Sequence, residues 1–295
     1  TVGPELRKRI QSIVNTGLIE IKEDFKIYWK KFPIAKLIAG KDYLNPNISL
    51  IVDDILENDD KKNLSSFIEN WIKEKIHLIL KSLIDLRDLK ESNSSIKALA
   101  YQLYENNGVI KREVVVEYLK KLGQDERKIL RDLGVKFGRY HVFLFRLLKP
   151  EAVSLRTLLW KNFNQENFAL TPPTFGLNFL DDKTIKNKDF MLLCGFENFD
   201  NYFVRIDILE RLFVQIINSN LEKDKEIKLI PEMLNLLGCS KDSFKKLIEK
   251  MNYKIFEKDK DIYFKYNPKK QIKKTFRKTT TLNNPFKVLK NLNLN

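Results

Sequence analysis

The sequence has few of the residues that build metal centres, disulfide frameworks or histidine-dependent active sites. It holds two cysteines and two histidines in 295 residues, and Cys194, Cys239, His77 and His141 are isolated from one another. A structural zinc site needs four ligands in close pairs, and a disulfide framework needs several cysteines. This composition argues against a zinc centre and a histidine-based catalytic centre. We interpret both cysteines as small buried thiols in a reducing compartment.

Signatures of nucleotide binding and of membrane insertion are also missing. No G-x-x-x-x-G-K-[ST] phosphate loop occurs, because Ala35 stands where its first glycine would precede Gly40-Lys41. No run approaches the roughly 18 apolar residues of a membrane helix, and no signal peptide is visible. We therefore predict a cytoplasmic segment without a membrane partner, which by itself is non-catalytic and needs no cofactor or metal ion.

Positive charge is what the sequence has in excess. Its 54 lysines and arginines outnumber 39 aspartates and glutamates, and the formal net charge is +15. Residues 267–295 contain eight of these cations and no acid, and we predict that they form a disordered basic tail. Such an excess favours a polyanionic partner through steering and counterion release. A lysine-rich proteome would give the same excess, so the positive net charge alone does not establish a polyanionic partner.

One stretch, Leu133–Trp160, mixes cations with aromatic residues. Gly134 fits the end of one helix, where glycine turns left-handed without a Cβ penalty, and Pro150 fits the start of the next. The connector between them is either a buried joint with core aromatics or a nucleic-acid surface. For the surface, the candidate binding residues are Lys136, Phe137, Arg139, Tyr140, His141, Arg146 and Lys149.

Hydrophobic periodicity divides the chain into five segments and predicts a mainly α fold. Alternation over Ile19–Trp29 indicates a small N-terminal β-hairpin, and three-four spacing from Phe67 to Leu86 begins a helical bundle. Further helices are expected at 95–106, 111–122 and 125–133. The predicted segments are a hairpin-containing region at 1–46, a helical accessory domain at 47–161, a linker at 162–189, a winged-helix-like α+β domain at 190–266 and the tail at 267–295.

The segment 190–266 predicts helix, helix, turn, helix and hairpin, which is the order of a winged helix-turn-helix. A recognition helix needs an exposed face that can meet bases and phosphates. The candidate contacts on the third helix are Lys241, Lys245, Lys246 and Lys250. Asp242 and Glu249 lie between them and would repel phosphates. We therefore favour packing or non-specific contact over sequence readout by this helix.

Six pieces of sequence, spread over nearly the whole chain, share one resemblance and keep its order. They are WKKFPIAKLIAG (Trp29–Gly40), ALAYQLYENNGVIKREVV (Ala98–Val115), LRDLGVKFGRYHVFLFRLLKPEAVSLRTLLW (Leu130–Trp160), GFENFDNYFVRIDILERL (Gly195–Leu212), IPEMLNLLGCSKDSF (Ile230–Phe244) and the closing NNPFKVLKNL. These pieces resemble the C-terminal half of bacterial superfamily-two helicases of the DExH type, relatives of the mitochondrial degradosome RNA helicase. Phe145 departs from the pattern, which leads us to expect proline there.

The resemblance implies that the parent protein is an ATP-dependent helicase, with two RecA-like motor domains upstream that would bind ATP and Mg²⁺. None of the motor's ATP-binding residues has a counterpart here, so whether this chain is itself an enzyme stays open. The implied partners are single-stranded RNA or DNA, held without sequence preference, and the motor domains. Two alternatives remain: a stand-alone winged-helix DNA-binding regulator, and a scaffold that docks a ribonuclease.

Overall fold

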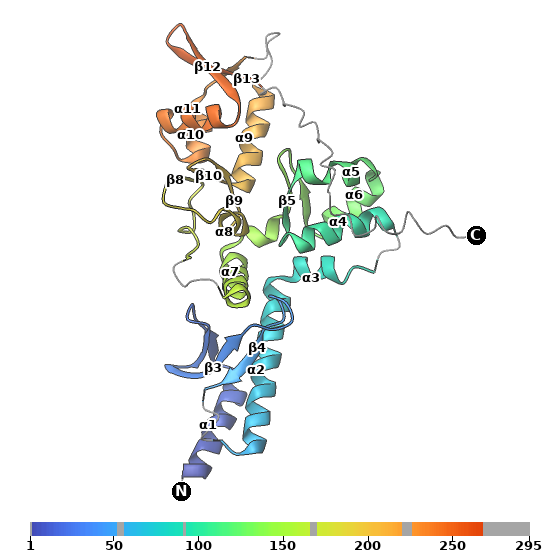
Figure 1. Ribbon diagram of the computed structural model, residues 1–295, viewed down its shortest axis with the longest axis vertical. Coiled ribbons are helices and arrows are strands. Elements are labelled where there is room, and N and C mark those ends of the chain that lie inside the picture. The colour runs from blue at the N-terminus through green and yellow to red at the C-terminus, as the bar shows by residue number, and fades with distance from the viewer. Residues whose placement is uncertain (1, 52–55, 91–92, 166–169, 220–225, 268–295) are drawn as a thin grey trace, which may run out of the picture.

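The fold is a mixture of helices and small sheets. The computed structural model describes residues 2–51, 56–90, 93–165, 170–219 and 226–267 (Figure 1). Helices make up about 50% and strands 22% of it, and the described strands form four antiparallel sheets. The prediction of a mainly helical bundle is therefore wrong, and the fold is α+β. Most of the missed strands have three or four residues, too few for alternation to stand out from a helical period.

The N-terminal part is a sheet covered by one long helix. In chain order it contains α1 (Val2–Thr16), β1 (Ile19–Ile21), β2 (Lys26–Trp29), β3 (Phe32–Ile38), β4 (Asn47–Leu50) and α2 (Asn58–Ile79). The expected β1–β2 hairpin is confirmed, but it belongs to a four-stranded sheet. Helical structure does not begin at Asn47 as predicted, because Asn47–Leu50 pairs with β3. α2 buries one apolar stripe, Leu64, Ile68, Ile72 and Ile76.

The central part places a three-stranded sheet among short helices. It contains α3 (Lys81–Arg87), α4 (Ser94–Glu105), β5 (Val109–Lys111), η2 (Arg112–Val115), α5 (Val116–Lys120), α6 (Gln124–Asp132), β6 (Val135–Phe137), β7 (His141–Leu144), η3 (Phe145–Leu148) and α7 (Pro150–Asn164). Gly134 has the expected left-handed backbone, with φ of 93°, and Pro150 opens α7. The connector between them is not an irregular joint. It is the β6–β7 hairpin followed by a 3₁₀ turn, in a sheet of order β5-β7-β6.

The predicted linker 162–189 contains regular structure. It includes the end of α7, β8 (Phe179–Asp181) and the start of α8 (Lys188–Leu193), and β8 pairs with β10 (Tyr202–Arg205) beside β9 (Phe196–Phe199). Leu170, Leu180 and Ile185 pack against a buried cluster shared by α7, α8 and β9. Because β8 finds its partner about twenty residues later, no local pattern marks it as a strand.

The C-terminal part has the predicted order of three helices and a hairpin. It contains α9 (Ile206–Asn218), β11 (Ile227–Lys228), α10 (Pro231–Leu237), α11 (Lys241–Lys250), β12 (Tyr253–Lys258) and β13 (Asp261–Tyr266). The two-residue β11 was missed, and it completes a sheet of order β11-β13-β12. The predicted basic tail lies outside the described residues, apart from Asn267.

Two main cores are joined along a seam. One core runs from Ile10 to Leu159, so the predicted segments 1–46 and 47–161 share it, and the other lies within 202–264. Arg156 of α7 is fully buried and donates to the carbonyl oxygens of Asn107 at 2.7 Å and of Leu147 at 3.2 Å, and also to that of Leu193. This arginine ties the first core to the segment that leads into the second.

Candidate nucleic-acid interface

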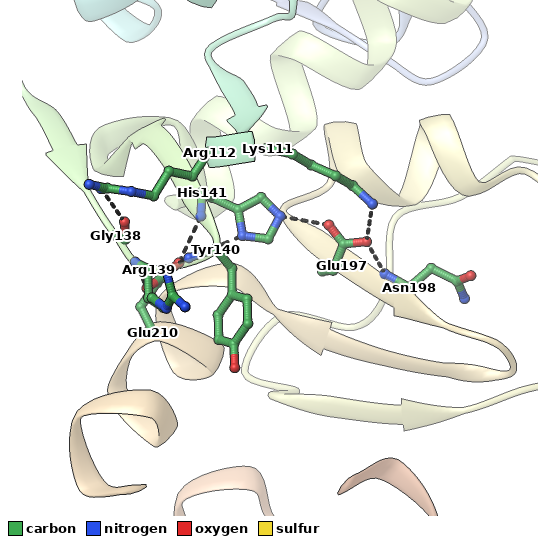
Figure 2. A network of polar contacts seen from close by, with 9 residues as sticks. All are labelled: Lys111, Arg112, Gly138, Arg139, Tyr140, His141, Glu197, Asn198 and Glu210. Carbon is green, nitrogen blue, oxygen red and sulfur yellow. Dashed lines mark hydrogen bonds and ion pairs between the residues drawn. The ribbon is translucent and has the colours of Figure 1, made fainter. Parts of the chain in front are cut away.

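The tip of the β6–β7 hairpin is bound by one carboxylate of α9 (Figure 2). Glu210 accepts hydrogen bonds from the backbone N–H groups of Arg139, of Tyr140 at 2.8 Å and of His141 at 2.9 Å. Successive N–H groups that point inward form a concave site for an anion. Glu210 occupies such a site and thereby fixes the hairpin tip on the first turns of α9.

A buried histidine continues this contact to a third element. The His141 side chain is 1% exposed, and its Nε2 lies 2.6 Å from Oε2 of Glu197 in β9, while its Nδ1 lies 3.7 Å from Oε1 of Glu210. Lys111 of β5 reaches the other Glu197 oxygen at 3.0 Å. We call Lys111, His141, Glu197 and Glu210 the seam network, because they join the central sheet to β9 and α9 (Figure 2).

The ionisation of the seam network follows from its partners. Burial alone lowers the pKa of His141, but the hydrogen bond with Glu197 and the negative charges of Glu197 and Glu210 outweigh it, so the pKa is raised. Burial raises the pKa of both glutamates, but their hydrogen bonds and the nearby cations lower it by a larger amount. Each pKa is therefore below that of an ordinary glutamate. The network therefore favours a charged histidine between two carboxylates.

Two of the predicted binding residues, Tyr140 and His141, make contacts within this seam. The Tyr140 ring packs edge-on against Phe213 at 5.5 Å, and its hydroxyl shares a hydrogen bond with that of Tyr253. Burial, followed by the proximity of Tyr253, raises the pKa of Tyr140. His141 is buried in the ion network. The His141 ring therefore offers no face to a base, whereas the Tyr140 ring is only partly buried.

Next to the seam lies an open pocket of about 660 Å³, which we call the cationic pocket. It brings together the predicted Lys136, Phe137 and Arg139 from the hairpin. Sequence reasoning missed its other cations, Arg112 and Arg211. The remaining lining residues are Gly138, Phe143, Phe145, Asp207, Glu210, Phe213, Val214 and Ile217. Phe137 is also flanked by two arginines of α6, Arg127 and Arg131, each with its guanidinium carbon 5.7 Å from the ring centre.

The carboxylates of the cationic pocket are compensated within the fold. Asp207 accepts two hydrogen bonds from Arg205, at 2.7 and 3.0 Å, and Glu210 is held by three amides and His141. Arg139 and Lys136 are exposed, and the Arg139 guanidinium lies 5.5 Å from the ring centre of Phe213. The pocket therefore combines uncompensated cations with aromatic surface, which suits a phosphate-bearing ligand with a planar base.

The other predicted contacts are scattered. Arg146 and Lys149 are exposed but do not line the cationic pocket, and Lys149 is the residue that precedes α7. On α11, Lys245 pairs with Glu257 at 3.2 Å and Lys250 pairs with Asp200 at 2.7 Å. Lys241 and Lys246 are exposed and, within the described residues, have no ion-pair partner. None of the four α11 lysines lines the cationic pocket.

Comparisons with known proteins identify no relative of this chain. No family model, curated protein or solved structure matches the chain. Within the part of the chain that the structure describes, no cluster of three or more metal-binding side chains occurs, and no helix could span a membrane.

Gly138 allows Glu210 to approach the hairpin, and we predict that replacing it weakens the seam. A Cβ at Gly138 would lie 2.3 Å from the carboxyl carbon of Glu210. That carboxylate is held by three amides, so it cannot move without breaking them. We expect Gly138→Ala to lower the free energy of unfolding by about 1–2 kcal/mol, measured by urea denaturation. Gly123→Ala, which would meet only the Glu126 carboxylate, is the matched control, and an equal loss in both would contradict this role.

Proposed function

We propose that this chain is the nucleic-acid-engaging C-terminal region of an ATP-dependent helicase and holds a single strand of RNA or DNA in the cytoplasm without sequence preference. The upstream RecA-like motor would supply ATP hydrolysis with Mg²⁺, and this segment would guide the strand. The resemblance of the six sequence pieces supports the parentage. The observation that carries the binding function is the cationic pocket, where Lys136, Arg139, Arg112 and Arg211 surround aromatic side chains.

The chemistry of the cationic pocket explains how a strand would be held. Arginine and lysine neutralise phosphates and release condensed counterions, which makes binding strong at low salt and independent of sequence. Aromatic faces add stacking, and every base has such a face. Phe145 is 44% exposed at the rim, while Phe213 and Phe137 are partly covered by arginines. Phe145 is therefore the aromatic residue best placed to meet a base.

We predict that reversing two charges of the cationic pocket weakens binding. In the double variant Lys136→Glu/Arg139→Glu, affinity for a fluorescein-labelled oligouridylate should fall about tenfold, and the log-log salt slope should shrink by about 1.4, because two phosphate contacts are lost. Fluorescence anisotropy over a salt series measures both quantities. The matched control is Lys73→Glu/Lys97→Glu, which makes the same charge change at exposed positions of α2 and α4. Equal losses in both pairs, or no binding by the unmodified chain, would refute the proposal.

A second candidate, the protein-docking scaffold, is supported by the apolar rim of the same pocket. Val214 and Ile217 of α9 are 55% and 54% exposed, more than a phosphate backbone requires. A ribonuclease partner would be retained after nuclease treatment in a pull-down, whereas a strand-mediated association would be lost. The regulator alternative has less support, because two of the four α11 lysines are engaged in ion pairs. Equal competition by random duplex would exclude it.

A further inference from the structure

The outer face of the β12–β13 hairpin carries a pair of like charges that the fold itself does not explain. Lys254 and Lys265 are direct cross-strand partners, and both are exposed. Among the described residues, neither ammonium group has a hydrogen bond or an ion pair. Like charges directly opposite each other destabilise an antiparallel pair. The Lys254–Lys265 pair, which we call the lysine rung, therefore lowers the stability of the hairpin.

Three other charged residues of this hairpin form ion pairs within the fold. Glu257 pairs with Lys245 at 3.2 Å, Asp261 pairs with Lys228, and Lys258 pairs with Glu226. Glu257, Lys258 and Asp261 thus each have a partner of opposite charge within the fold. Lys254 and Lys265 differ from these residues because each faces a like charge across the strands, and this arrangement suits an anionic partner outside the chain.

An aromatic platform adjoins the lysine rung. Phe256 and Tyr263 are the next cross-strand pair on the same face, and their rings lie nearly parallel, at 13°, with centres 6.0 Å apart. Both are partly exposed, and the Lys258 ammonium lies 5.3 Å from the ring centre of Phe256 and 5.8 Å from that of Tyr263, so it covers part of the platform. Tyr253 and Phe264, on the opposite face of the hairpin, are buried in the second core. Phe256 and Tyr263 are not part of that core. The tight turn at Asp259-Lys260 has positive φ at both residues and holds the two strands in this register.

We propose that the outer face of the β12–β13 hairpin is a second nucleic-acid contact, in which Lys254 and Lys265 hold a backbone phosphate and Phe256 with Tyr263 receives an unpaired base. This inference rests on the proposed function for its ligand class, but it concerns residues that the cationic pocket does not contain. The neighbouring platform favours a nucleic acid over an acidic protein, because bases stack on flat aromatic surface and carboxylate side chains do not. A phosphate between the two ammonium groups also removes their mutual repulsion.

Lys254→Glu separates binding from stability. The new carboxylate faces Lys265 across the strands, so the hairpin exchanges a repulsive rung for an attractive one and the melting temperature should stay equal or rise. Affinity of the full chain for a fluorescein-labelled oligothymidylate should nevertheless fall about tenfold, and the salt slope should decrease by about 0.7 for each lost phosphate contact. Lys97→Glu on α4 provides the same charge change elsewhere.

The aromatic platform is tested with a strand that lacks bases. Phe256→Leu keeps the side chain apolar but removes its ring, so it should weaken binding of oligothymidylate about threefold to tenfold and leave binding of an abasic strand of equal length unchanged. If the unmodified chain binds neither strand, the proposed function and this inference both fail. If it binds but Lys254→Glu matches Lys97→Glu, the hairpin contact alone is refuted. Equal weakening of both strands by Phe256→Leu, or equal competition by polyglutamate, would also overturn it.

Discussion

Replacing Glu210 with alanine should lower the free energy of unfolding by about 3–5 kcal/mol, because its removal leaves several groups without a partner at once. Three backbone N–H groups of residues 139–141 lose their acceptor, and His141 loses one of its two carboxylates. A buried donor that is left unpaired costs about 1–3 kcal/mol, and this penalty applies to the partly buried amides of Tyr140 and His141 more than to the exposed amide of Arg139. Urea denaturation followed by circular dichroism measures the loss.

The design of this experiment includes a conservative variant and a matched control. Glu210→Gln keeps one acceptor oxygen for the amides and removes only the charge, so it should recover part of the loss. Glu249→Ala changes an exposed glutamate of α11 and should alter stability by less than about 0.5 kcal/mol. A Glu210→Ala protein as stable as Glu249→Ala would mean that the hairpin tip does not depend on α9.

Glu210 and Gly138 should also be coupled. If the glycine exists to admit the carboxylate, the Gly138→Ala substitution should cost little once Glu210 is already alanine. The double variant should then be more stable than the sum of the two single losses predicts, by about 1 kcal/mol.

The sequence predicts those elements that are long or end in strong local signals. α2 buries one stripe at three-four spacing, α7 begins at Pro150, and α6 ends before Gly134 with its left-handed backbone. These signals act between residues a few positions apart, so a periodicity argument detects them. The order of α9, α10, α11 and the final hairpin was accessible for the same reason.

Most strands were not predictable, because their stability depends on partners that are distant in sequence. β5 pairs with β7 more than thirty residues later, and both are too short to show a pattern. The same reason hid Glu210, which contacts the hairpin tip across about seventy residues. The aromatic and basic composition of Leu133–Trp160 distinguishes this segment from the rest of the sequence. It could not say which side chains face solvent, and Tyr140 and His141 proved to be contacts of the seam.

The two interpretations of that segment, buried joint and charged surface, both describe part of it. The hairpin alternates its side chains, so Val135 lies in the core while its neighbour Lys136 faces the cationic pocket. The tip then inserts Tyr140 beside the second core. The geometry of the candidate binding surface thus depends on the seam network, because the seam network fixes the hairpin against α9.

The seam network should make stability depend on pH through His141. A histidine whose pKa is raised on folding contributes stability that is complete below its ordinary pKa of 6.5 and is lost as the pH rises through the raised value. Glu197 and Glu210 have lowered pKa values, so their contribution is complete above their ordinary pKa of 4.5 and is lost as the pH falls through the lowered values. Between 4.5 and 6.5 all three contributions are present.

His141→Gln tests this assignment, because the amide can still donate a hydrogen bond to Glu197 but carries no charge at any pH. We expect the variant to be less stable than the unmodified chain by about 2 kcal/mol below pH 6.5, and the difference to shrink as the pH rises above it. Urea denaturation across a pH series measures both curves. His77, the other histidine, is exposed on α2, and His77→Gln should leave the curve unchanged. A difference between His141→Gln and the unmodified chain that stays constant at every pH would show that the buried ring is neutral and that the seam is held by hydrogen bonds alone.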